Sequence, residues 1–311
     1  MLIQVNPKLL FLKPENRRLT RRQKMSFNEE LQAFQDTHPF SETNVDSIGV
    51  KYLLCGNSNS KVTLVYLVGG TGFSIVWFNH LKQMEQDYRI LTFDYPMEIN
   101  DIEELADFVI QLIKKLEIKY PVFIGASLGG FLSQLVLRKY QNDDVAYALY
   151  STSALSNSAL KDLKKQYKIY GILLPLMKII PYRWIRNLLF RVSKKMVGME
   201  NEARADRSYM EDFFAWVYGN YTKEFDIHMT SLMISVAKVK PITMQEYQKA
   251  DKNVLLVLPT DDKAFSEEAK NELIEIFPDA VVTMVHGGHT ATLYKVEPYV
   301  KSTQRFIEER L

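Results

Sequence analysis

The fold class is decided by the stretch Pro121-Val-Phe-Ile-Gly125-Ala126-Ser127-Leu128-Gly129-Gly130-Phe131-Leu132. An apolar run with strand character ends at Gly125, and a helical pattern begins at Gly129. Between them one serine is flanked by glycines in the G-x-S-x-G arrangement of a nucleophile elbow. A serine held in a sparsely populated backbone conformation needs neighbours without side-chain bulk, so that strand and helix can pack closely. The spacing predicts that Ser127 stands clear of a sheet and that the amide of Leu128 faces the same space.

The composition is that of a globular chain with a large core. Of its 311 residues, 47% are hydrophobic and 24% charged, and the net charge of +2 argues against nucleic acid as a partner. Cys55 is the single cysteine, so no intramolecular disulfide can form and we expect a reducing, cytoplasmic location. No apolar run approaches the roughly 18 residues of a membrane span, and the first residues lack the pattern of a signal peptide.

Residues 1–24 form a basic N-terminal extension, in which seven Lys or Arg face only Glu15. Three interpretations stay open. The extension is a basic arm for a membrane surface or an anionic partner, or a solvated tail, or it results from a start codon assigned too early, with Met25 as the true first residue.

Strand patterns alternate with helical patterns on both sides of the elbow. The strands are expected over residues 47–55, 61–68, 88–95, 121–125, 145–150, 253–258 and 280–285. Asn100 with Glu103 is the predicted N-terminal cap of the helix that follows the third strand. This alternation predicts an α/β fold: a doubly wound, mostly parallel sheet with a helical cap inserted before the last two strands. The core comprises residues 25–155 and 251–311, and the cap or lid residues 156–250.

A serine nucleophile needs a base, and the base needs a group that orients it. In doubly wound serine enzymes these partners follow the serine in the order Asp or Glu, then His. Three histidines are excluded, because two precede the serine and one lies in the cap: His38, His80 and His228. Of the remaining two, His289 is favoured over His286, because Gly287 and Gly288 carry the chain past the strand end into a loop. Zinc binding by this H-x-x-H pair is disfavoured, since no third ligand stands at a metal spacing.

Two adjacent aspartates, Asp261 and Asp262, close the strand before the histidine, and either one has the position in the chain that the acid requires. A turn without chemistry is the alternative. The oxyanion hole needs two backbone donors. Leu128 supplies one, and the loop Gly69-Gly70-Thr71-Gly72 after an early strand can supply the other through the amide of Gly70. This loop lacks the Lys-Ser/Thr and the G-x-G-x-x-G of phosphate-binding loops.

These motifs resemble the α/β-hydrolase fold superfamily over about residues 45–311. More narrowly, three stretches resemble maspardin, and residues 34–39 are similar to its N-terminal part. The stretches are Tyr88-Arg-Ile-Leu-Thr-Phe-Asp-Tyr-Pro96, Gly125-Ala-Ser-Leu-Gly-Gly-Phe-Leu132 and Ser266-Glu-Glu-Ala-Lys270 with Phe277-Pro278. The resemblance implies a hydrolase-like fold, yet the animal maspardin is thought to be a binding protein without a complete triad. This chain departs from maspardin, because it has Gly288-His289 and a second aspartate.

The superfamily's G-x-x-D pattern implies that Asp262 is the acid, given Phe265 three residues further on. Two departures from the superfamily remain, Pro259 in place of glycine and Val68 in place of the usual histidine before the oxyanion glycine. The expected function is a serine hydrolase that cleaves an ester, thioester or amide of a small apolar acyl substrate. Its catalytic residues are Ser127, Asp262 and His289, its oxyanion donors are Gly70 and Leu128, and no metal or organic cofactor is implied. The alternative is a maspardin-like non-catalytic scaffold that binds a protein partner.

The cap carries an unusual charge. Residues 160–196 hold ten Lys or Arg and only Asp162 as an acid, on an apolar helical background. Three uses stay open: a packed cover with solvated cations, a peripheral contact with an anionic membrane or a protein, and guidance of an acidic substrate towards Ser127. The oligomeric state is not predicted.

Overall fold

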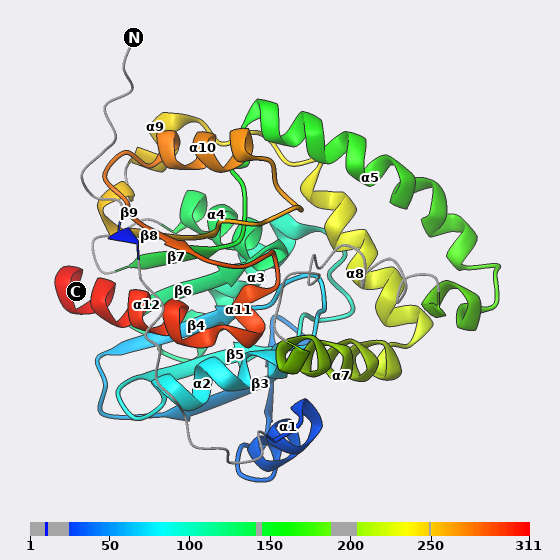
Figure 1. Cartoon of the computed structure of the whole chain (residues 1–311), viewed down its shortest axis with the longest axis horizontal. Helices are drawn as coiled ribbons and strands as arrows, with labels where there is room; N and C mark the ends of the chain where they lie inside the picture. Colours follow the sequence, from blue (N-terminus) through cyan, green and yellow to red (C-terminus); the bar gives the residue numbers. More distant parts are fainter. Residues whose placement is uncertain (1–9, 12–24, 141–144, 188–203, 249) are drawn as a thin grey trace.

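The computed structural model describes residues 10–11, 25–140, 145–187, 204–248 and 250–311 (Figure 1). Its strands are β1 Leu10–Phe11, β2 Ser41–Val45, β3 Ile48–Gly56, β4 Val62–Leu67, β5 Arg89–Phe93, β6 Tyr120–Ala126, β7 Ala146–Tyr150, β8 Val254–Pro259 and β9 Val281–Val285. Its α-helices are α1 Phe27–Gln35, α2 Phe78–Met84, α3 Ile102–Lys115, α4 Leu128–Lys139, α5 Asn157–Met177, α7 Arg204–Asn220, α8 Lys223–Val236, α9 Met244–Gln248, α10 Glu267–Ile276, α11 Ala291–Tyr294 and α12 Val296–Arg310. Residues 182–187 are also helical, and there are two short 3-10 turns among the described residues, η1 Ser74–Trp77 and η3 Asp251–Asn253.

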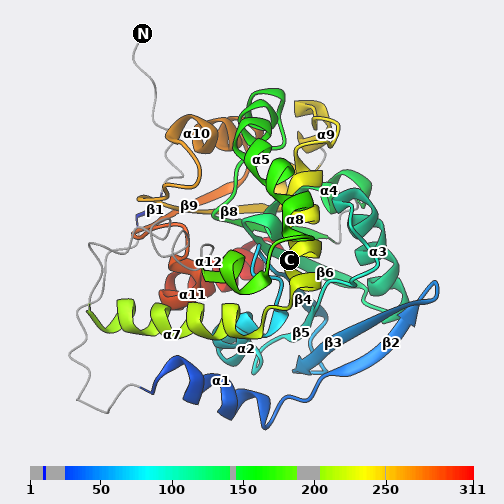
Figure 2. The same cartoon turned by 90° about the vertical axis from the view of Figure 1, so that its right-hand side faces the viewer.

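The described strands form one sheet in the order β1-β9-β8-β7-β6-β4-β5-β3-β2. All neighbours from β1 to β5 in that order are parallel, and β2 and β3 are added antiparallel at the far edge. Helices α3 and α4 cover one face of the sheet, and α2 and α12 cover the other (Figures 1 and 2). The predicted fold class, a doubly wound and mostly parallel sheet, is confirmed.

The central strands are apolar throughout because both faces are covered. Leu64 to Leu67 of β4 and Val122 to Ile124 of β6 are at most 1% exposed. Their register aligns Leu67 with Gly125 and Ala126 with Tyr150, so the carboxyl ends of β4, β6 and β7 meet at one edge of the sheet. Ser127 lies at this edge.

The structure adds two strands that the sequence did not predict and moves one helix cap. Strand β2 was not predicted, because Ser41-Glu-Thr-Asn lacks the alternation of apolar residues that marks a strand. Helix α3 is capped by Asp101, one residue after the predicted cap, and the Asp101 carboxylate accepts from the amides of Glu103 and Glu104. In the basic extension, Leu10 and Phe11 pair in parallel with β9. The rest of the extension and the question of Met1 or Met25 lie outside the described residues.

Between β7 and β8 the chain leaves the sheet and forms α5, α7, α8 and α9. Helix α8 lies along α5, and α7 packs on α1 (Figures 1 and 2). The ring of Phe27 holds α1 in place, because it meets Phe78 of α2 and Phe213 of α7 edge to face. No helix in the described part of the chain is both long enough and apolar enough to cross a bilayer.

Candidate active site

Ser127 occupies a strained turn between β6 and α4. Its φ of 53° and ψ of −116° lie outside the regions that L residues ordinarily adopt. The flanking glycines explain how the turn closes. A Cβ atom at Gly125 would lie 2.1 Å from the carbonyl oxygen of Gly129, and one at Gly129 would lie 2.1 Å from that of Leu67. Any other residue at these two positions would push the helix away from the sheet, so the G-x-S-x-G spacing is a packing requirement.

His289 reaches Ser127 from the loop after β9. Strand β9 ends at Val285, and Gly287 has a φ of 140° that favours glycine. The Nε2 atom of His289 lies 3.0 Å from Ser127 Oγ. The imidazole is 20% exposed, so its edge is open to solvent at the site.

Asp262 completes a hydrogen-bonded row. Its Oδ2 atom lies 2.9 Å from Nδ1 of His289, and its side chain is 1% exposed. Its Oδ1 atom accepts from the amide of Ala264 at 2.8 Å, which fixes the carboxylate plane. A carboxylate beside Nδ1 holds the proton on that nitrogen, so Nε2 is left to accept from the Ser127 hydroxyl.

The neighbouring aspartate takes a different direction. Asp261 is 59% exposed, and its Oδ2 lies 3.3 Å from Nδ1 of His286, which is itself 83% exposed. The structure therefore brings Asp262 and His289 to Ser127, and it places Asp261 and His286 together on the surface. The two histidines of the H-x-x-H pair therefore face different carboxylates.

The two predicted oxyanion donors belong to the start of α4 and to the Gly69–Gly72 loop. Leu128 is the first residue of α4, where an amide has no intrahelical acceptor. A Cβ atom at Gly69 would lie 3.6 Å from that of Ser127, so the Gly69–Gly72 loop runs beside the serine. The carbonyl of Gly69 accepts from the amide of Gly72 at 3.1 Å, and the amide of Gly70 in the same trans peptide therefore points the opposite way.

Helix α8 and the junction before it cover this loop. The hydroxyl of Tyr221 donates to the carbonyl oxygens of Gly70 and Thr71, at 3.2 and 3.0 Å. A Cβ atom at Gly72 would collide with Phe225 at 2.5 Å and with Met229 at 2.7 Å, which shows how closely α8 approaches. Tyr221 was not predicted, and the sequence around it contains no signal that could have pointed to it.

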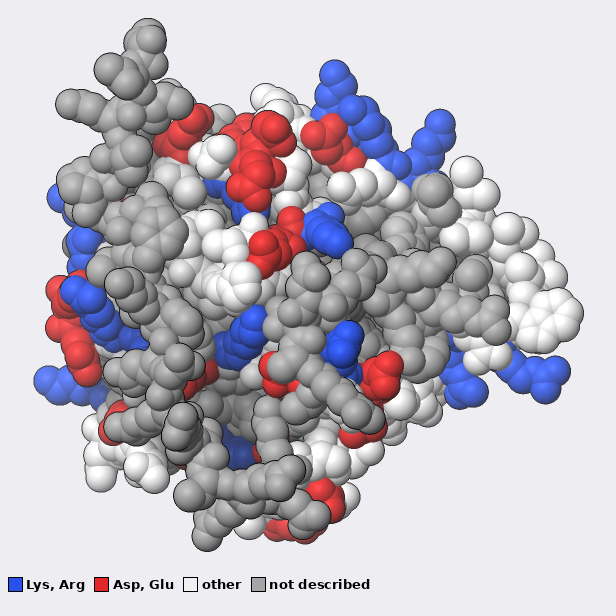
Figure 3. All heavy atoms as spheres, in the orientation of Figure 1, with Lys and Arg blue, Asp and Glu red and all other residues white. Residues whose placement is uncertain are grey.

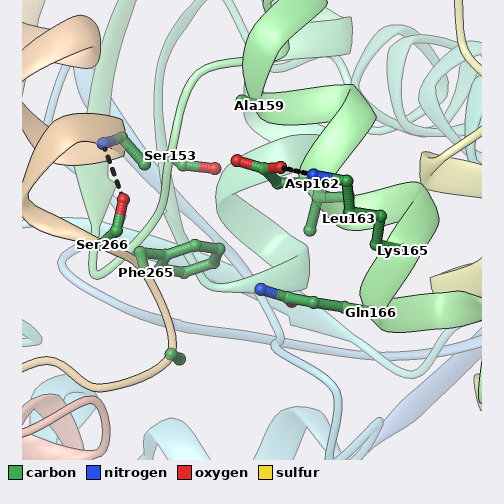
Figure 4. Close-up of a pocket in the computed structure, with 10 residues that line it drawn as sticks. Ser153, Ala159, Asp162, Leu163, Lys165, Gln166, Phe265 and Ser266 are labelled. Carbon is green, nitrogen blue, oxygen red and sulfur yellow. Dashed lines mark hydrogen bonds and ion pairs between the residues drawn. The ribbon is translucent and has the colours of Figure 1, made fainter.

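A cavity of about 260 Å³ lies next to the triad, between α5 and the start of α10. Figure 4 shows Phe265 and Ser266 on one side of it, and Asp162 and Gln166 of α5 on the other. Neither Ser127 nor His289 is among its lining residues. The ring of Phe265 lies next to both the cavity and the triad, because it lines the cavity and its centroid is 5.5 Å from that of the His289 ring.

Comparison with solved structures finds the same architecture. An α/β hydrolase enzyme, MGS-M2, from a Medee basin deep-sea metagenome library superposes with a TM-score of 0.72 at 14% identity, over 86% of this chain and 97% of that one. The enol-lactonase of Burkholderia xenovorans LB400 gives 0.67 at 15% identity, over 86% and 100% of the two chains.

This chain has the α/β-hydrolase fold. A carboxylesterase structure from Nitrososphaera gargenis is also similar, with a TM-score of 0.65 at 18% identity over 87% and 98% of the two chains. No family model and no curated protein sequence matches the chain. At these identities the likeness establishes the fold, and the chemistry must be argued from the site itself.

Proposed function

We propose that this chain is a serine hydrolase that acts through an acyl-enzyme. One observation carries the proposal. A continuous hydrogen-bonded row joins Ser127 Oγ, the two nitrogens of His289 and the buried carboxylate of Asp262, at 3.0 and 2.9 Å. The row is mounted on an elbow whose backbone strain the flanking glycines maintain. Nucleophile, base and orienting acid thus meet the geometric requirements of acyl transfer.

The steps follow from the donor and acceptor roles of these atoms. His289 Nε2 takes the hydroxyl proton as Ser127 Oγ attacks the acyl carbon, and the resulting imidazolium is stabilised by Asp262. The amides of Gly70 and Leu128 are proposed to bind the oxyanion. The proton on Nε2 then passes to the leaving alcohol, thiol or amine as its bond to the acyl carbon breaks. A water molecule repeats the sequence on the acyl-enzyme and releases the acid.

The surroundings of the serine favour a small apolar acyl group. Phe265 stands beside His289, and the sulfur of Met233 would be 3.6 Å from a Cβ atom at Gly70. Such side chains offer contacts to hydrocarbon and no partner for a charged acyl chain. The residue at the elbow is a serine and not an aspartate, which argues against dehalogenase and epoxide hydrolase chemistry.

The alternative function is that of a maspardin-like scaffold that binds a protein partner and does not hydrolyse. The three stretches that resemble maspardin motivate it. We disfavour it because a scaffold has no need of an imidazole aligned between a strained serine and a carboxylate that is 1% exposed.

We also propose that residues 156–250 act as a cap whose outer surface contacts a membrane. Four large apolar side chains, at the end of α5, in the turn after it and in helical residues 182–187, are strongly exposed: Ile172, Leu176, Ile179 and Trp184, at 61, 42, 81 and 62%. Exposed Lys178 and Arg183 lie among them in the chain, and exposed Lys168 precedes them by one helical turn. Figure 3 shows uncharged side chains at this right-hand end of the molecule with Lys and Arg beside them. Apolar residues framed by cations fit an anionic lipid surface.

Turnover of acyl esters of graded chain length tests the hydrolase proposal. Asp262→Asn and Asp261→Asn form a matched pair, because the two residues are adjacent and chemically identical. We expect Asp262→Asn to lower kcat by about three to four orders of magnitude, and Asp261→Asn to change it less than about twofold. Similar activity in the two variants, or no turnover by the folded wild-type chain on any ester of the series, would contradict the proposal.

A further inference from the structure

Three side chains of metal-ligating type come from distant parts of the chain and lie together near the amino ends of the parallel strands, outside the active site. They are His38, which follows α1, Cys55 of β3, and Glu85, which ends α2. One imidazole nitrogen, the thiol sulfur and one carboxylate oxygen all lie within 4.8 Å of one another. No other group of three such side chains is found in the described part of the chain. We propose that these residues bind one divalent transition-metal ion of borderline softness, with Zn²⁺ as the best-fitting ion.

The ligand set agrees with that choice. Zn²⁺ accepts nitrogen, thiolate sulfur and carboxylate oxygen in a tetrahedral arrangement, whereas Ca²⁺ and Mg²⁺ prefer oxygen alone. The His38 Nε2 and Glu85 Oε2 atoms are 2.8 Å apart, within hydrogen-bond distance. Tetrahedral zinc bonds of about 2.0 Å to these atoms and about 2.3 Å to sulfur would place them roughly 3.3 Å from each other and about 3.5 Å from the sulfur. The three ligand atoms all lie within 4.8 Å of one another, so side-chain shifts of about 1 Å bring them to this geometry. The three side chains leave a fourth position for water.

The contacts around His38 support a ligand role independently. Its Nδ1 atom lies 3.0 Å from the carbonyl oxygen of Phe34 and 2.8 Å from the hydroxyl oxygen of Thr37, so this nitrogen is held away from the cluster and Nε2 faces Glu85. The ring of Phe34 stacks on the imidazole at 3.8 Å and 7° and fixes its plane. A histidine with one ring nitrogen held beside a backbone carbonyl and the other directed at the ligand atoms is the usual arrangement at metal sites.

The position of the cluster indicates a structural or regulatory ion. Cys55 pairs with Ile90, which is level with Val122 five residues before Ser127, about 16 Å along the strands. The cluster joins the segment after α1 to β3 and to the end of α2, which gather at one end of the molecule in both views (Figures 1 and 2). A bound ion would hold these three segments together.

Titration of the untagged chain with Co²⁺ tests the proposal, because a thiolate bound to Co²⁺ gives a charge-transfer absorption in the near ultraviolet. Cys55 is the only cysteine, so the band can arise from this site alone. We expect the band to saturate at one ion per chain, to disappear on addition of Zn²⁺, and to be lost in Cys55→Ser. Glu85→Gln and His38→Gln should weaken binding by about tenfold or more.

The exposed His286–Asp261 pair provides the control, because it offers imidazole and carboxylate without a thiol. His286→Gln should leave the titration unchanged. Zn²⁺ at about one hundred times its dissociation constant should raise the Tm of the wild type by about 5 °C and that of Glu85→Gln much less. Absence of the band in the folded wild type would overturn the proposal. A band that Glu85→Gln and His38→Gln leave intact would overturn it too, even if Cys55→Ser failed to fold.

Discussion

At the scale of single residues, the site depends on a serine that is held in an unfavourable conformation. A φ of 53° with a ψ of −116° costs of order 1–3 kcal/mol for a residue other than glycine. The strain persists because β6 and α4 are locked against each other through Gly125 and Gly129, where no Cβ fits. The Ser127 amide also donates to the Tyr150 carbonyl at 3.2 Å, which ties the turn to β7. The conformation that exposes Oγ is thus enforced from both sides.

Asp226 of α8 provides a residue-scale prediction about pH. It is 4% exposed, and burial raises its pKa to about 6, with the nearby Tyr182 hydroxyl acting in the opposite direction. A folded-state pKa above the unfolded value means that the native chain binds more protons between about pH 4 and 6, so stability falls as the pH rises through this window. We expect Asp226→Asn to be near neutral at pH 4 and to stabilise the fold by up to about 3 kcal/mol above pH 6.

Chemical denaturation at four pH values from 4 to 7 measures this difference. Glu224→Gln, an exposed acid on the same helix, is the control and should show no such dependence. If the stabilities of Asp226→Asn and the wild type stay parallel from pH 4 to 7, the carboxylate is not penalised by burial.

At the scale of elements, the junction between α7 and α8 positions the loop that is proposed to bind the oxyanion. Tyr221 holds the Gly70 and Thr71 carbonyls, and Phe225 and Met229 press on Gly72. These contacts connect the inserted helices to the chemistry without touching the reacting atoms.

Tyr221→Phe tests this positioning. Loss of an oxyanion donor costs about 10²–10³ in kcat, and loosening its loop should cost a fraction of that, about tenfold, with little change in KM. Tyr218→Phe is the control, because it removes a hydroxyl from a ring that packs against Tyr221 at 5.4 Å. An effect confined to KM, or the same effect in both variants, would exclude a role for Tyr221 in aligning the loop.

Local patterns predicted the elements well, and contacts between distant segments escaped prediction. The elbow could be found because Gly125, Ser127 and Gly129 are neighbours in the chain, and His289 because chain order left few alternatives. Choosing Asp262 over Asp261 required a family pattern, since adjacent residues cannot be told apart by position alone. Tyr221 and the cluster of His38, Cys55 and Glu85 were missed, because only tertiary packing brings their partners together. The cap of α3 was misplaced by one residue, since Asn100 and Asp101 are both good caps.

At the scale of the whole molecule, the exposed surface of the inserted helices predicts binding to anionic vesicles. Screening shortens the electrostatic range from about 14 Å at 0.05 M salt to about 4 Å at 0.5 M, so vesicles that contain phosphatidylserine should bind the chain at low salt and release it at high salt. A variant with Ile179→Ser and Trp184→Ser should lose most of this binding. Met97→Ser, at a residue 42% exposed elsewhere on the surface, should retain it.

The same salt series distinguishes the other uses of the cap cations. If they guide an acidic substrate, kcat/KM for an anionic ester falls between these salt concentrations, whereas that for a neutral ester barely changes. Flat profiles for both esters, with no vesicle binding, would leave the cap as a packed cover with solvated cations. The cytoplasmic location inferred from one cysteine and the domain boundaries inferred from the sequence stay predictions.

The central claim is that His289 activates Ser127, and labelling with a fluorophosphonate tests it most directly. The labelled residue is located by peptide mass mapping, and the rate of labelling is compared in the wild type, His289→Ala and His286→Ala. Our account predicts that the label lies on Ser127, that the rate falls about a hundredfold or more in His289→Ala, and that His286→Ala reacts like the wild type. An unlabelled Ser127 in the folded wild-type chain, or equal rates in the wild type and His289→Ala, would contradict it.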